Sequence, residues 1–159
     1  MEIQTLAQML DHAESIVHDQ MNATGKVSPI VIAQKGDGTT IDVHYKPPPT
    51  AIQRRIHALA LGNHFREWGV VSYVVAHEVW MNSAPTLEAA LALGRPSKSP
   101  DRGEGVMIQA HNIVTSQTRI FRIDRPDGKP KLTDISEDHD RAHPGGTWDN
   151  LLMDPNAVH

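Results

Sequence analysis

Histidine is unusually frequent, with ten copies among 159 residues, so metal ligation and acid–base catalysis are the first functions to consider. His57 and His64 share a face of a predicted helix but lie about 10.5 Å apart along its axis. Both ligands of one metal ion must come within about 2 Å of it, so this pair cannot chelate. His139 and His143 are four residues apart, but Pro-Gly-Gly follows them and no helix is predicted there. We therefore expect no metal and no other cofactor.

A carboxylate and an imidazole on neighbouring predicted strands are the best candidates for catalysis. Glu78 lies on one strand, His111 on the next and Arg122 on the last. If the strand register brings them together, Glu78 would raise the pKa of His111, and the two could act as an acid–base pair with Arg102 or Arg122 as an anion anchor. The alternative is an ordinary cross-strand ion pair on the wetter face of the sheet.

The segment 94–104, Gly-Arg-Pro-Ser-Lys-Ser-Pro-Asp-Arg-Gly-Glu, is a candidate anion-binding loop. It has three basic residues in eight, but it lacks both Gly-x-Gly-x-x-Gly spacing and a following helix to hold a phosphate. The alternative is a rigid loop in which Arg102 pairs with Asp101 or Glu104. The candidate ligand-binding residues are Arg95, Lys98, Asp101, Arg102, Glu104 and Arg122.

The elements that must position these residues begin with a helix. Apolar residues recur at steps of three and four from Ile3 to Met21, which predicts an amphipathic helix that ends near Gly25. Two alternating or β-branched runs, 30–33 and 39–43, flank Gly-Asp-Gly and predict a β-hairpin that stops at three prolines.

A second helix and three more strands follow. Thr50 is a suitable N-cap for a helix over 51–67, whose apolar stripe is formed by Ile52, Ile56, Leu59 and Ala60. The segment 70–81 is apolar on both faces, apart from His77, and predicts a long strand in the middle of a sheet. A long connection over 82–104, with a helix-like segment at 87–93, leads to a second hairpin over 106–123.

This order, helix-strand-strand-helix-strand-strand-strand, predicts an α+β domain over 1–125, with an antiparallel sheet of about five strands packed with two helices. Residues 126–159 are predicted to form an acidic, Pro/Gly-rich tail. The tail holds seven acidic and three basic residues, whereas 1–125 hold twelve of each, so the net charge of −4 belongs to the tail. Its apolar residues, which could anchor it to a partner, are Trp148, Leu151, Leu152 and Met153.

Composition excludes several classes of protein. The absence of cysteine excludes a disulfide scaffold and thiolate catalysis. The mild acidic excess argues against a nucleic-acid binder that works by neutralising phosphates. The N-terminal sequence is not that of a signal peptide, and the longest apolar stretch is too short and too interrupted to cross a bilayer. We expect a cytoplasmic protein with no membrane and no nucleic acid among its partners.

One resemblance can be drawn. The strand ending Glu-Val-Trp-Met at 78–81, followed by Pro-Ser-x-x-Pro-Asp-Arg-x-Glu at 96–104, resembles a group of small uncharacterised bacterial and phage-associated proteins over about residues 50–125. The resemblance implies no activity. We therefore expect a binding or assembly module, with a protein partner or self-association. The alternative is a small hydrolase or nucleotide-handling enzyme that uses Glu78 and His111.

Overall fold

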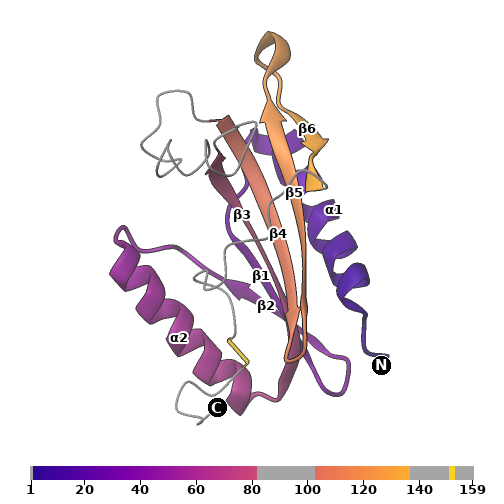
Figure 1. Cartoon of the computed structure of the whole chain (residues 1–159), viewed down its shortest axis with the longest axis vertical. Coiled ribbons are helices and arrows are strands. Elements are labelled where there is room, and N and C mark those ends of the chain that lie inside the picture. The colour runs from indigo at the N-terminus through magenta and orange to yellow at the C-terminus, as the bar shows by residue number, and fades with distance from the viewer. Residues whose placement is uncertain (1, 82–102, 137–150, 153–159) are drawn as a thin grey trace, which may run out of the picture.

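The computed structural model describes residues 2–81, 103–136 and 151–152, and shows an α+β fold (Figure 1). Its strands form one antiparallel sheet in the order β2-β1-β3-β4-β5-β6. This confirms the predicted fold class, with one strand more than expected. The described elements are α1 (Leu6–Thr24), β1 (Ile30–Lys35), β2 (Thr40–His44), α2 (Ala51–Glu67), β3 (Val70–Met81), β4 (Gly103–Asn112), β5 (Ser116–Asp124), the short 3₁₀ helix η2 (Pro126–Gly128) and β6 (Lys131–Asp134).

The two helices lie on opposite faces of the sheet (Figure 1). Side chains alternate along β3, so Val74 and Ala76 join a buried cluster with α1, whereas Tyr73 and Val75 join a second cluster with α2. We name these clusters the α1 core and the α2 core. The central position predicted for 70–81 is confirmed, because β3 pairs with β1 on one side and β4 on the other.

Helix α1 is well defined at both ends and buries one whole face. Thr5 accepts a hydrogen bond from the N–H of Gln8, whose side chain accepts in return from the N–H of Thr5. Gly25 ends the helix in the left-handed conformation, with φ of 74°. The residues of α1 that are buried against the sheet are Leu6, Met9, Leu10, Ala13, Val17 and Met21.

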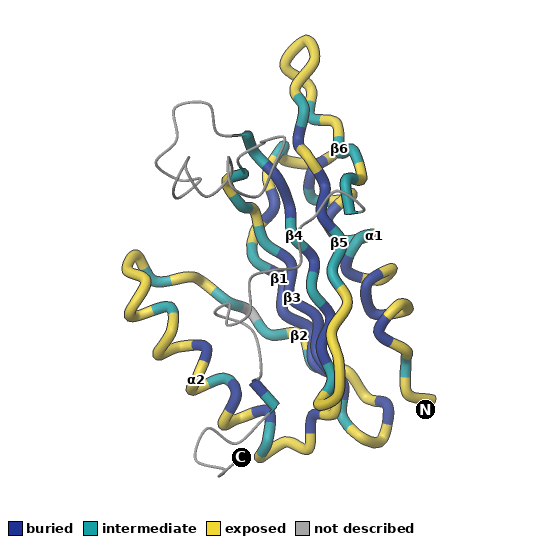
Figure 2. Tube along the Cα trace, viewed as in Figure 1, coloured by how far each residue is buried: buried dark blue, intermediate teal, exposed yellow. Residues whose placement is uncertain are grey.

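Helix α2 packs differently. Its bounds match the predicted 51–67, and Thr50 caps it by accepting from the N–H of Gln53. However, its buried residues are Ala58, Gly62 and Phe65, and the apolar stripe that includes Ile52 and Ile56 is exposed (Figure 2). The sheet therefore packs against a face of α2 that is formed by small residues and Phe65. The more apolar face of the helix is exposed.

The region predicted as a tail adds to the fold. Strand β6 pairs with β5, with Leu132 opposite Ile123. Leu151 belongs to the α2 core and is 3% exposed. Strand β6 was not expected because it has only four residues, Lys131–Asp134, directly after Pro130, and a run this short gives no clear period-two pattern.

Gln34 is a fully buried polar side chain that connects the N-terminal segment to the sheet. Its Nε2 donates to the Ser72 Oγ at 2.9 Å and to the Gln4 carbonyl oxygen at 3.1 Å. Its Oε1 accepts from the N–H of Gln4 at 2.7 Å. These bonds hold the start of α1 beside the centre of the sheet.

We predict that Gln34→Ala lowers the free energy of unfolding by about 2–3 kcal/mol, because it leaves a cavity and removes the partners of Gln4 and Ser72. Urea denaturation measures this change. Gln117→Ala, at an exposed position of β5, is the control and is expected to change stability by less than about 0.5 kcal/mol. Equal effects of the two substitutions would contradict a structural role for the buried network.

Candidate functional site

Glu78 and His111 lie on opposite faces of the sheet. His111 is directly opposite Tyr73, which faces α2, whereas Glu78 is opposite Val106, which faces α1. Glu78 is also five residues beyond Tyr73, or about 17 Å along the strand. Direct proton transfer needs about 3 Å between the two groups. The structure therefore does not bring this candidate pair together, and the predicted acid–base arrangement is not formed.

His111 has a packing role in the α2 core. It is 6% exposed, and its ring stacks on that of Tyr73 with 4.8 Å between the ring centroids and an interplanar angle of 17°. This is the close cross-strand contact expected of directly opposed residues in an antiparallel pair. The imidazole therefore lies on the face of the sheet that packs against α2.

Glu78 and Glu104 instead hold the connection that follows α1. The Glu78 Oε1 accepts from the N–H of Val27 at 2.8 Å. Glu104 pairs with Arg125 at 2.9 Å, and Arg125 also donates to the carbonyl oxygen of Gly25 at 3.2 Å. Two predicted functional carboxylates therefore fix the end of α1 against β3 and β4.

Of the other candidate residues, only Glu104 and Arg122 lie in the described part of the chain. Arg122 is half-exposed and pairs with Asp124, two residues along the same strand. It is opposite Gly105, about 20 Å along β4 from His111. Arg95, Lys98, Asp101 and Arg102 lie outside the described residues.

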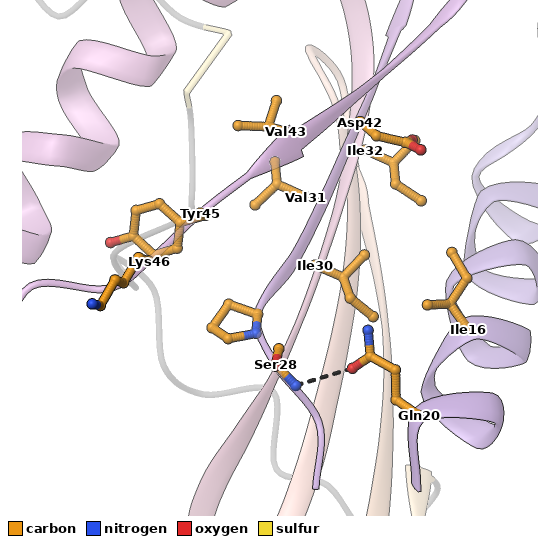
Figure 3. A pocket seen from close by; sticks show the side chains of 11 residues that line it. Ile16, Gln20, Ser28, Ile30, Val31, Ile32, Asp42, Val43, Tyr45 and Lys46 are labelled. Atoms are coloured by element: carbon orange, nitrogen blue, oxygen red, sulfur yellow. Dashed lines mark hydrogen bonds between the residues drawn. The ribbon is translucent and has the colours of Figure 1, made fainter. Parts of the chain in front are cut away.

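A cleft of about 390 Å³ lies at the β2 edge of the sheet, beside α1 (Figure 3). Its exposed charged residues, Asp42 and Lys46, have opposite signs, so the cleft has no clear preference for an anion or a cation. The Oε1 of Gln20 accepts from the N–H of Ser28 at 3.0 Å. The cleft is lined by Ile16, Gln20, Ser28, Pro29, Ile30, Val31, Ile32, Asp42, Val43, Tyr45 and Lys46.

Apolar side chains are exposed on the outer face of α2. Ile52, Ile56 and Leu59 are 75%, 57% and 40% exposed, and we name these three the α2 stripe. They recur at steps of four and three, so they lie above one another on a single side of the helix. An exposed row of large aliphatic residues on a helix is typical of a protein-binding surface.

A second exposed apolar site is the turn between β4 and β5, where Ile113 and Val114 form what we name the hairpin tip. The Asn112 Oδ1 accepts from the N–H groups of Val114 and Thr115, at 2.8 and 2.7 Å. The tip is therefore held in one conformation with its two aliphatic side chains in solvent. The sequence carried a signal for it, since a turn between strands is usually polar and this one is Ile-Val.

Among the described residues, no group of three or more metal-ligating side chains lies close enough together to hold an ion. None of the described helices combines the length and the apolar character needed to cross a bilayer. Comparison of the whole chain with protein-family models, curated proteins and solved structures finds no match.

The pKa of His77, on β3, affects how the stability of the fold depends on pH. Burial lowers the pKa of its imidazole, and the Glu78 carbonyl oxygen, 3.2 Å from Nδ1, opposes part of this shift. The unfolded chain therefore takes up a proton at His77 at a higher pH than the folded chain. The stability contributed by neutral His77 is present above the ordinary imidazole pKa of about 6.5 and is lost as the pH falls from there toward the lower folded pKa.

We predict that His77→Gln weakens the loss of stability between about pH 7.5 and about pH 5.5, because the substituted side chain does not titrate. The measurement is the free energy of unfolding in urea as a function of pH. His12→Gln, on the exposed side of α1, is the control and keeps the wild-type slope. An identical slope for wild type and His77→Gln would show that burial of His77 makes no contribution.

Proposed function

We propose that the chain is an assembly module that self-associates through the α2 stripe. The exposure of Ile52, Ile56 and Leu59 carries this proposal. Burying aliphatic surface is worth about 25 cal/mol per Å² removed from water, so three such side chains in one row favour contact with another apolar surface. The same helix buries only small residues and Phe65 against the sheet, so a contact on its outer face would add to its stability.

A second copy of the chain is the partner that this surface fits. When two α2 helices pack antiparallel about a two-fold axis between Ile56 and Leu59, Ile56 of one copy faces Leu59 of the other, and the reverse contact is identical. Ile52 then lies near Asn63, and Arg55 lies near Ala60. The pairing therefore joins Ile56 and Leu59 of the two copies at its centre and sets no like charges directly opposite.

We further propose that the module acts in the cytoplasm and binds protein rather than nucleic acid. Residues 1–125 hold twelve acidic and twelve basic residues, so this part of the chain has no excess of positive charge to attract phosphate. The alternative of an enzyme that uses Glu78 and His111 loses its basis, because the two side chains face different helices.

We predict that Ile56→Glu weakens self-association by at least about 100-fold, because it sets two buried carboxylates near the two-fold axis. Sedimentation equilibrium over a wide concentration range measures the mass of wild type and variant. Wild type is expected to be a dimer and Ile56→Glu a monomer.

Val114→Glu is the matched control, since Val114 is an exposed aliphatic residue of the hairpin tip and is not part of the α2 stripe. It is expected to keep the wild-type mass. A wild-type chain that stays monomeric at the highest concentration, or an Ile56→Glu variant that remains dimeric, overturns the proposal. Loss of the dimer in Val114→Glu alone would assign the interface to the tip instead.

A further inference from the structure

Leu151 occupies a groove between α2 and the sheet. In Figure 1 its short segment lies between the C-terminal half of α2 and the strands. Leu151 is 3% exposed and belongs to the same buried cluster as Phe65 of α2 and Tyr73 of β3. A residue from the far end of the chain thus fills the space that separates a helix from a sheet.

The main chain of Leu151 is held by one hydrogen bond on each side. Its N–H donates to the Tyr73 Oη at 3.3 Å, and its carbonyl oxygen accepts from the Arg66 Nη1 at 2.9 Å. Tyr73 belongs to β3 and Arg66 to α2, so both elements form a hydrogen bond with the same residue. Hydrogen bonds to main-chain groups combined with a pocket for one side chain are the usual means of peptide recognition.

Gly62 makes room for this residue. A Cβ atom at position 62 would lie 2.8 Å from the Leu151 carbonyl oxygen and 3.5 Å from its Cα. Glycine inside a helix costs about 1 kcal/mol relative to alanine, and Gly62 has no left-handed conformation that would require it. The close approach of Leu151 is therefore the feature of the described structure that explains a glycine here.

The α2 core also contains residues of α2 and of the sheet besides those that hold Leu151. Ala58 and Phe65 of α2 lie in the same cluster as Val31 and Val75 of the sheet. Residues 137–150 lie outside the described part of the chain and include four acidic residues, one proline and two glycines. They join Leu151 covalently to the rest of the chain, so a free peptide must compete with a tethered segment that is present at a high effective concentration.

We propose that the groove between α2 and the sheet is a peptide-binding site for a leucine-bearing segment, and that the C-terminal segment of the chain is its exchangeable occupant. The site recognises the N–H and carbonyl groups of one residue through Tyr73 and Arg66, and an aliphatic side chain through the α2 core. It uses the inner face of α2, whereas the proposed dimer uses the α2 stripe, so the two contacts involve different residues and can be tested separately.

The test uses the full-length chain with Leu151→Asp, which empties the groove, and a fluorescein-labelled peptide of residues 147–159. Fluorescence anisotropy measures binding. Leu151→Asp is expected to bind this peptide at least about 10-fold more tightly than wild type, because the tethered segment of wild type competes for the site. Addition of Gly62→Ala to Leu151→Asp is expected to reduce binding by at least about 10-fold, because its methyl group blocks the carbonyl oxygen.

The control is the same peptide with aspartate in place of Leu151, which is expected not to bind. Three results overturn the proposal: no binding by a Leu151→Asp chain with a native circular dichroism spectrum, equal binding of the two peptides, or equal binding by wild type and Leu151→Asp. Association of wild type into dimers is measured separately, so failure of one proposal leaves the other in place.

Hydrogen exchange of the wild-type chain provides a second measurement, which does not depend on how well Leu151→Asp folds. An exchangeable segment opens without unfolding the sheet, so the Leu151 N–H is expected to exchange at least about 100-fold faster than the N–H groups of Val74 and Val75. Exchange of the Leu151 N–H at the rate of these strand amides would show that the segment opens only with the whole fold, and would overturn the proposal.

Discussion

The alternation of side chains along β3 is the constraint on which the rest of the structure depends. From Ser72 to Ala76 every residue is buried, with successive side chains directed to opposite faces. The even-numbered residues contact the α1 core and the odd-numbered residues the α2 core. A shift of one residue in the pairing of β3 would exchange the two sets and set Tyr73 against α1, so the register of this strand determines what each helix can pack against.

The two faces of the sheet are covered unequally. On one face, six buried residues of α1 lie along the helix, and its ends are fixed by the Thr5 cap and by the contacts of Arg125 and Glu78 near Gly25. On the other face, α2 supplies Ala58, Gly62 and Phe65, and Leu151 completes the layer. Glu78 and His111, which the sequence suggests for catalysis, instead contact the residues that pack on either face of the sheet. Helix α2, which buries fewer residues than α1, is the helix that carries the exposed α2 stripe.

The sequence predicts the elements well because each has a strong local signal. Thr50 and Gly25 mark helix ends through capping and a left-handed backbone, and the segment from Val70 to Met81 has apolar residues on both faces, which favours a central strand. The relation between strands has no such local signal. Whether Glu78 and His111 share a face depends on which residue of β3 lies opposite which residue of β4, and a long connection between strands leaves this register open.

The composition of α2 shows a similar limit. Ile52, Ile56 and Leu59 define one apolar row, while Ala58, Gly62 and Phe65 define another that is displaced by six residues, or about 120° around the helix. The periodic pattern favours the first row as the buried one because its side chains are larger. The structure buries the second, since the small residues allow Leu151 to approach closely.

Helix α2 therefore joins the two proposed contacts. Its inner row, with Arg66, holds Leu151, and its outer row is the α2 stripe. If the C-terminal segment leaves, α2 loses both the buried leucine and the hydrogen bond from Arg66, so the position of the helix on the sheet becomes less fixed. A dimer contact that requires α2 in its docked position then favours the occupied groove, and by thermodynamic linkage an occupied groove favours the dimer to the same extent. The short segment at Leu151 would in this way bias assembly without contacting the second copy.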